Sequence, residues 1–305
     1  MKFRESKVEI IPQDWSLDGI YKQCELAGRT AYKSEDRITE GSAKKFVEAL
    51  MKLKHGAVLE HGTVYLTIPY EPLSSIGGPE RKYRYNKYSR VIDDENLLHG
   101  VAYITTNLRV IFENDWMDDL QYLSEPTKYH EKRITAKFIC SRSIAQEITR
   151  HRVFSFLMES QRYVGYNKDK FGGEITIIVP EWIKARINDI ASYNNNDDLA
   201  RMSYAAALRD GRMHEDKAII MWAVSQEMSE THYLSLTSEL NVKAEEARSV
   251  LTNDCKTELV MTGFISDWEH FFDLRSKGTT GKPHPDIKIL ADTLYLEFIN
   301  KGYLK

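Results

Sequence analysis

The sequence predicts an α+β fold, in which helices pack around a small, mostly antiparallel sheet. Three observations support this prediction. Several stretches carry apolar residues at helical spacing, a few short stretches have strand character, and glycine or proline separates many of them. With 305 residues and 42% hydrophobic content, the chain can bury a substantial core. We expect a single domain over residues 1–305.

The N-terminal part is predicted to form two helices followed by a strand. Residues 17–32 and 42–54 place apolar side chains on one helical face each. These side chains are Leu17, Ile20, Cys24 and Leu26 in the first helix, and Phe46, Leu50, Met51 and Leu53 in the second. The strand follows at Val64 to Ile68.

The middle of the chain changes character and then returns to regular patterns. Residues 70–130 contain Gly77-Gly78-Pro79, a run rich in Arg, Lys and Tyr, and a predicted helix near 107–123. Residues 134–140 alternate like a half-buried strand, and 143–149 form a short helix. A further strand is expected at 175–179, where Pro180 ends it.

The rest of the chain is predicted to be mostly helical. Four segments carry the apolar spacing of helices, namely 213–228, 244–251, 257–272 and 285–299.

Charge and composition exclude several classes of protein. The chain has 42 basic and 45 acidic residues, whereas a general nucleic-acid binder would show a basic excess, so we expect no nucleic-acid partner. No apolar run reaches the roughly 18 residues of a membrane span, and the N-terminus lacks the apolar core of a signal peptide. Three widely spaced cysteines suggest neither a disulfide framework nor a zinc motif. We therefore expect a cytoplasmic protein without a metal site.

The tract Arg150-His151-Arg152 is the most informative part of the sequence. It lies between apolar residues on both sides, so its guanidinium groups are not on a freely solvated loop. A half-buried guanidinium requires an anionic partner, and its fork of donors fits phosphate or carboxylate. An internal salt-bridge cluster with Glu147 and Glu159 is the alternative to a ligand site.

The wider pattern favours the ligand site. Arg150-His151-Arg152, seven residues and then Ser160 resembles the signature of the flavin-dependent thymidylate synthases, which methylate dUMP to dTMP. Further matches are Ser155, Arg162 and Tyr163 in the signature, His55 to Glu60-His61 near the N-terminus, and Arg248 and Arg275 near the C-terminus. The resemblance covers about residues 20–70 and 130–300. In that family the first strand returns almost directly to the helix before the signature, so about 70–130 is an insertion, which we interpret as a solvated lobe or an oligomer contact.

The resemblance implies a set of substrate-binding residues for dUMP. Arg162 and Arg248 would hold the phosphate beside Ser160 and Gln161, and Arg275 would act as the catalytic arginine at the pyrimidine, where negative charge develops. The remaining substrate-binding positions are Glu147, Arg150 and Glu159. Without the resemblance, Arg275 would be interpreted as a cation at a helix C-terminus.

The resemblance also implies a flavin site. Arg150, His151 and Arg152 would chiefly contact FAD, and His55 and Glu60 would lie on the flavin side, although a capped turn before a strand explains these two equally well. His270 stands where the family has an asparagine, and His284 is a candidate flavin-facing histidine.

Several positions depart from the family pattern. Leu157-Met158 replaces an Asn-Glu pair and the acid is displaced to Glu159, while Glu147 stands for a glutamine. Phe264, like His270, replaces a flavin-site asparagine. These changes leave the arginines in place and alter the hydrogen bonding around them.

Together these features imply a homotetrameric FAD-dependent thymidylate synthase that uses dUMP, methylenetetrahydrofolate and NADPH. One alternative is a metal-dependent hydrolase using His55, Glu60 and His61, but their spacing matches neither of the compact helical zinc motifs. A second alternative is a non-catalytic nucleotide-binding relative that has lost activity at Leu157 and Met158.

Overall fold

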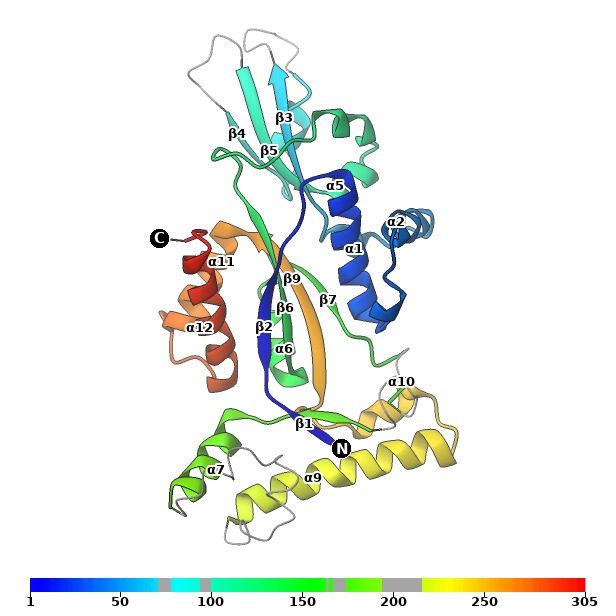
Figure 1. Cartoon of the computed structure of the whole chain (residues 1–305), viewed down its shortest axis with the longest axis vertical. Helices are drawn as coiled ribbons and strands as arrows, with labels where there is room; N and C mark the ends of the chain where they lie inside the picture. Colours follow the sequence, from blue (N-terminus) through cyan, green and yellow to red (C-terminus); the bar gives the residue numbers. More distant parts are fainter. Residues whose placement is uncertain (71–77, 94–99, 163–164, 167–173, 194–215, 305) are drawn as a thin grey trace.

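Figure 1 shows the computed structural model, which describes residues 1–304 apart from 71–77, 94–99, 163–164, 167–173 and 194–215. Its described strands form a four-stranded sheet, a three-stranded sheet and a two-stranded sheet. All of the strand pairs are antiparallel except that of the two-stranded sheet. The predicted α+β class, with a small and mostly antiparallel sheet, is confirmed.

The four-stranded sheet forms the centre of the molecule, in the order β2-β6-β9-β7. Its strands are β2 (Lys7–Ile11), β6 (Arg133–Ser141), β7 (Ser155–Met158) and β9 (Lys256–Phe264). The second half of the sequence signature is therefore an edge strand, β7, paired with β9 from Ser155↔Thr262 to Met158↔Leu259. A core of buried side chains joins this sheet to α6 (Arg142–Ile148), α11 (Ile265–Phe272) and α12 (Pro285–Asn300).

The predicted helix at 257–272 is wrong over its first half. Residues 256–264 form β9, and the helix α11 begins only at Ile265. All nine residues of β9 are buried, because the strand lies between β6 and β7 and is covered on both faces. A strand buried on both faces has no alternation of polar and apolar residues, so its apolar run is indistinguishable from a buried helix. The β-branched residues Thr257, Val260 and Thr262 favour the strand.

The three-stranded sheet, in the order β3-β5-β4, lies at one end of the molecule (Figure 1). It consists of β3 (Thr63–Tyr70), β4 (Arg90–Asp93) and β5 (Gly100–Asn107). A second core of buried side chains packs this sheet against helices that come before, between and after its strands in the sequence. These are α1 (Leu17–Tyr32), α2 (Ser42–Lys52), α3 (Gly56–Leu59), α4 (Arg81–Arg84), α5 (Leu108–Glu113) and the 3-10 helix η2 (Met117–Tyr122).

This region differs from its prediction in two ways. The expected helix near 107–123 is broken into α5 and η2, and Asp115 between them has a positive φ of 57°. The described part of 70–130 is also more than a solvated lobe, because Tyr83 is fully buried and its hydroxyl donates to Asp119 at 2.5 Å. The description of 70–130 as an insertion in a single domain stays a prediction.

The other end of the molecule carries a third core (Figure 1). Its elements are β1 (Lys2–Arg4), β8 (Thr176–Ile178), α7 (Glu181–Tyr193), α9 (Lys217–Leu234), the π-helix η4 (Ser235–Glu239), α10 (Ala244–Ala247) and the 3-10 turn η5 (Arg248–Val250). The helix expected at 213–228 is α9, which extends six residues further; 213–215 lie outside the described residues. None of the described helices combines the length and apolar character needed to cross a membrane.

Candidate functional site

The structure gathers many of the predicted site residues around one open pocket of about 650 Å³, which we call the basic pocket. Its walls come from the end of α6, the signature loop, α11, the π-helix η6 (Asp273–Lys277) and the segment before α12. The lining residues are Glu147, Arg150, His151, Arg152, Val153, His270, Leu274, Arg275, Thr280, Gly281, Lys282, Pro283 and His284. Glu147 is the only carboxylate among them, so the pocket favours an anion.

Arg275 is held in a fixed orientation at this pocket. Its Nε donates to His151 Nε2 at 3.0 Å, its Nη1 to the Glu147 carboxylate at 3.3 Å and its Nη2 to the Glu147 carbonyl at 3.4 Å. Three of the five guanidinium N–H groups are thereby used, and two remain for a ligand. Its partners lie on α6 and on the signature rather than on its own helix end. Arg275 belongs to the π-helix η6, a conformation that is frequent at functional sites.

His151 is the neutral partner of this arginine. Burial, together with the charges of Arg275, His270 and Arg150, lowers the pKa of His151 to about 4. Since its Nε2 accepts a hydrogen bond from Arg275, the proton of the neutral ring is on Nδ1. The ring packs edge-on against Phe271, with 5.0 Å between centroids. At neutral pH the His151 side chain therefore positions Arg275 without adding charge.

The predicted phosphate-binding residues lie on a different surface, beside α10. Arg162 Nε is 3.4 Å from the Glu245 carboxylate, and Arg248 Nε donates to the Glu245 carbonyl at 3.1 Å. Ser160 Oγ accepts from the Arg162 backbone at 3.2 Å. Arg162 and Arg248 are thus neighbours, as joint binding of one phosphate requires. They do not line the basic pocket of the same chain. Tyr163, next in the signature, lies outside the described residues.

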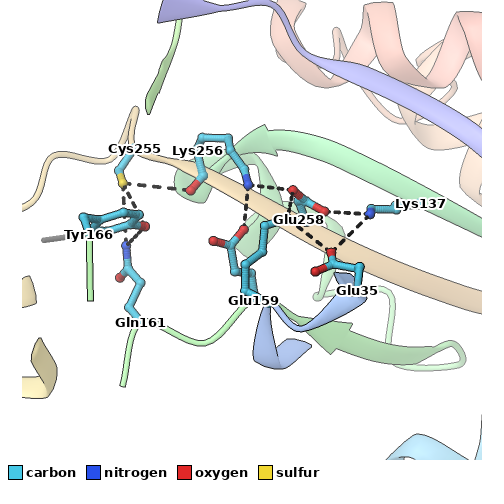
Figure 2. A network of polar contacts seen from close by, with 9 residues as sticks. Glu35, Lys137, Glu159, Gln161, Tyr166, Cys255, Lys256 and Glu258 are labelled. Carbon is cyan, nitrogen blue, oxygen red and sulfur yellow. Dashed lines mark hydrogen bonds and ion pairs between the residues drawn. The ribbon is translucent and has the colours of Figure 1, made fainter. Parts of the chain in front are cut away.

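Glu159 and Gln161, which were predicted to bind substrate, are buried in a polar network along β9 (Figure 2). Lys256 Nζ lies 2.8 Å from Glu159 and 2.7 Å from Glu258. Gln161 donates to Tyr166 at 3.3 Å. Glu159 therefore has an internal ion-pair partner, but this partner is Lys256, whereas the salt-bridge alternative expected an arginine of the signature.

Glu258 is the centre of that network. Lys137 Nζ is 2.7 Å from its carboxylate, and Lys33 contacts it from the end of α1 (Figure 2 shows Lys137 and Lys256). Burial alone raises the pKa of Glu258, but Lys256, Lys137 and Lys33 together hold it well below its usual range. None of Lys33, Lys137, Lys256 and Glu258 was among the predicted site residues. The pattern Lys256-x-Glu258 places two opposite charges on the same face of a strand, and this pattern could have indicated the ion pair.

The predicted flavin-side residues are distributed over more than one place. His55 is exposed and lines neither the basic pocket nor the second pocket described below. Glu60 pairs with Arg109 at 2.5 Å and lines a second pocket together with Arg152. His284 lines the basic pocket and also caps α12, where its Nδ1 accepts from the Asp286 backbone at 3.3 Å.

The geometry does not favour the hydrolase alternative. His61 is buried, and its Nδ1 lies 2.8 Å from Thr262 Oγ1, while Glu60 is engaged by Arg109. Within the described part of the chain, no group of three or more histidine, cysteine or acidic side chains is arranged to hold a metal ion.

Comparison with known proteins identifies the family. The profile of the family described as thymidylate synthase complementing protein matches residues 128–301, more than half of the chain. The chain belongs to this family. The matched range includes the whole basic pocket as well as Arg162 and Arg248. The resemblance that the signature indicated is confirmed.

Individual members of the family are more distant. A flavin-dependent thymidylate synthase of Corynebacterium efficiens is 30% identical over 151 residues, which are 50% of this chain and 50% of that protein. A probable flavin-dependent thymidylate synthase of Paramecium bursaria Chlorella virus 1 is 26% identical over 167 residues, or 54% and 66%. The chain thus spans about half the length of the Corynebacterium efficiens protein.

A solved structure of a UMP/dUMP methylase from Streptomyces cacaoi aligns with 98% of this chain and 93% of its own. The identity is 16% and the TM-score 0.41, a likeness too weak to support an inference.

Proposed function

We propose that the chain catalyses the reductive methylation of dUMP to dTMP, with methylenetetrahydrofolate as carbon donor and FAD and NADPH as the reducing system. Membership of the thymidylate synthase complementing protein family supports this activity. The observation that carries it is the geometry of the basic pocket. There His151 and Glu147 fix Arg275 near Arg150, and two N–H groups of the Arg275 guanidinium stay available for a ligand.

The pyrimidine of dUMP is proposed to lie against Arg275. Methylation requires negative charge to develop on the uracil ring, and a guanidinium that is already oriented stabilises that charge without reorganising. Glu147 and His151 supply the orientation. Because His151 is neutral, it leaves Arg275 as the cation at this point, and it can offer its Nδ1–H to a ligand.

The residues of the signature fit a flavin dinucleotide. Arg150 and Arg152 are exposed cations of the pocket, and Lys282, His270 and His284 face the same space. Such donors suit FAD, whose ring oxygens accept hydrogen bonds and whose phosphates are anionic. When bound, FAD would supply the reducing equivalents, while this chain's residues bind and orient the reactants.

An oligomer would bring the two basic surfaces together. Arg162 and Arg248 could reach the phosphate of the dUMP at Arg275 if they came from another subunit, so we propose the homotetramer that the family resemblance implies. A single domain over residues 1–305 and a cytoplasmic location are part of the same proposal.

The absorbance spectrum of the purified protein tests the cofactor. We expect the bands of an oxidised flavin, either in the protein as isolated or after FAD is added and excess removed. Bound metal without flavin would favour the hydrolase, and nucleotide binding without flavin would favour the non-catalytic relative. A colourless protein that does not retain added FAD would contradict the proposal.

Catalysis is expected to require no cysteine. Burial raises the pKa of Cys24 and Cys140 to about 12 and that of Cys255 to about 11, so hardly any thiolate is present at neutral pH. A thiolate nucleophile would need the opposite environment.

A variant with all three cysteines replaced by alanine should therefore still form dTMP in an assay with FAD and NADPH. Unfolding curves would separate any loss of stability from a loss of catalysis. If Cys255→Ala alone abolished dTMP formation in a protein that folds and binds FAD, the cysteine-independent mechanism would be wrong.

A further inference from the structure

A second pocket, of about 380 Å³, lies between the three-stranded sheet and the signature. One wall comes from the segment before β4, from β4 and from the end of β5, and the other from the signature and the start of α11. The lining residues are Glu60, Lys87, Tyr88, Arg90, Asn107, Arg133, Arg152, Val153, Phe154, Ser155, Phe264 and Asp267. Lys87 and Arg90 belong to 70–130, outside the range that matches the family.

Arg133 is the most unusual residue of this pocket. It begins β6, opposite Phe264, and is only 8% exposed. Its guanidinium donates to the Glu60 carbonyl at 3.0 Å, to Thr63 Oγ1 at 3.4 Å and to Ser155 Oγ at 3.3 Å, all of them neutral acceptors. Its Nε has no hydrogen-bond partner among the described residues.

Within the described part of the chain, the charge of Arg133 therefore has no close ion-pair partner, and the carboxylates of Glu60 and Asp267 act on it only from a greater distance. Burial lowers its pKa to about 10, so it stays protonated at neutral pH. No carboxylate of the described residues lies within 4.0 Å of its guanidinium nitrogens. A buried charge without a close counterion is unfavourable, and an anion in the pocket would stabilise it.

Other cations surround the same space. The guanidinium carbons of Arg90 and Arg133 lie 4.5 Å and 5.4 Å from the centre of the Phe264 ring. Lys87 and Arg152 complete the positive wall. Against these stand three acids: Glu60, which is already paired with Arg109, Glu131, which lies 3.5 Å from Arg90, and Asp267, whose pKa burial raises.

The second pocket adjoins the basic pocket, because Arg152 and Val153 line both. A ligand with two ends that passes Arg152 and Val153 would contact both pockets. Tyr88, which is 55% exposed, offers an aromatic ring for a planar base in the second pocket, whereas the ring of Phe154 is buried against Trp268. Phosphate between two heterocyclic ends is the chemistry of a dinucleotide cofactor.

We propose that this pocket binds a phosphate group of a dinucleotide cofactor through Arg133, Arg90 and Lys87, so that residues 70–130 supply part of the cofactor site. The inference deepens the proposed function and rests on it for the nature of the cofactor. The phosphate could be the diphosphate of FAD or the 2′-phosphate of NADPH. ADP represents the first and adenosine 2′,5′-bisphosphate the second.

The test is titration calorimetry of the full-length protein with these two probes. We expect one of them to bind, and Arg90→Ala and Lys87→Ala each to weaken it by about 10-fold, as for loss of one charge-assisted contact. The matched control is Arg81→Ala, an exposed arginine of the same segment that does not line the pocket. The affinity of Arg81→Ala for the probe should equal that of the unmodified protein.

Arg133→Met gives a second measurement through the melting temperature. The unmodified protein should be stabilised by the bound probe, and this ligand-induced rise should largely disappear in Arg133→Met, whatever its melting temperature without ligand. If neither probe binds, or if all three pocket variants bind as the Arg81→Ala control does, the inference is wrong.

These outcomes are separable from those of the proposed function. If the probe binds through Arg90 and Lys87 but no dTMP is formed, the pocket stands and the activity fails. If dTMP is formed and the pocket variants bind FAD and NADPH unchanged, the activity stands and the pocket assignment fails.

Discussion

Replacing Arg275 by alanine is expected to lower the rate of dTMP formation by about 100-fold or more, as for loss of one preorganised donor at developing charge. The flavin content should change little, because Arg150, Arg152 and Lys282 remain in the basic pocket. The measurement is kcat at saturating dUMP, with bound FAD determined from the absorbance spectrum of the same sample.

Two kinds of control sharpen this result. Lys277→Ala removes an exposed cation of the same π-helix that does not line the pocket, and it should leave turnover unchanged. Arg162→Ala and Arg248→Ala should instead mainly raise the KM for dUMP, because their proposed role is to bind phosphate. Unchanged turnover of Arg275→Ala would make Arg275 a helix-end cation without a catalytic role.

Replacing Glu258 by glutamine is expected to destabilise the fold by about 3–5 kcal/mol, the usual cost of removing one partner from a buried ion pair. The carboxylate of Glu258 is surrounded by Lys33, Lys137 and Lys256, whose charges would then repel one another. The free energy of unfolding in urea measures the effect. Glu48→Gln, a change at an exposed glutamate on α2, is the control and should lie within about 0.5 kcal/mol of the unmodified protein.

The pH dependence of stability gives an independent check. The pKa of Glu258 in the folded protein is below its ordinary value of 4.5, so its contribution to stability is complete above about pH 4.5 and is lost as the pH falls below it. Glu258→Gln should lack that part of the acid-induced loss. Equal stability of Glu258→Gln and the unmodified protein at pH 7 would show that the lysines do not depend on this carboxylate.

The basic pocket was the most predictable part of the protein. The two arginines of the signature were expected to be half-buried because their neighbours are apolar, yet both are exposed, so only the match to the family pattern placed them at this pocket. Arg275, more than a hundred residues away, was placed by its match to the family pattern, and His270 by its position in that pattern, where it replaces an asparagine. The structure brings both to the same pocket. Helix α1 was also predictable, because its apolar residues fall on one face.

Two features, the strand β9 and the ion pair of Glu159, depend on tertiary contacts and could not be predicted from the sequence. The segment that became β9 is buried throughout, and its run Leu259 to Met261 is continuously apolar, so the spacing of its apolar residues did not distinguish a strand from a helix. Glu159 looked like a displaced ligand of the signature. Its partner Lys256 is ninety-seven positions away in the chain and is reached only through the pairing of β7 with β9.

The separation of Arg162 from Arg275 was equally hidden. Both match the family pattern, and a pattern along one chain does not show whether two residues share a pocket in the same subunit. Arg133 was overlooked because a lone arginine before an alternating strand is ordinary in a sequence. Only the packing of the three-stranded sheet makes it a buried cation.

Formation of dTMP by the purified protein is the most direct test of the proposed activity. The protein is first freed of flavin and then supplied with dUMP, methylenetetrahydrofolate and NADPH, with or without added FAD, and the nucleotide product is separated and quantified. We predict that dTMP appears only when FAD is present and that omitting NADPH or the folate abolishes it. Absence of dTMP from folded protein that has bound FAD, or its formation by flavin-free protein without FAD, would contradict the account.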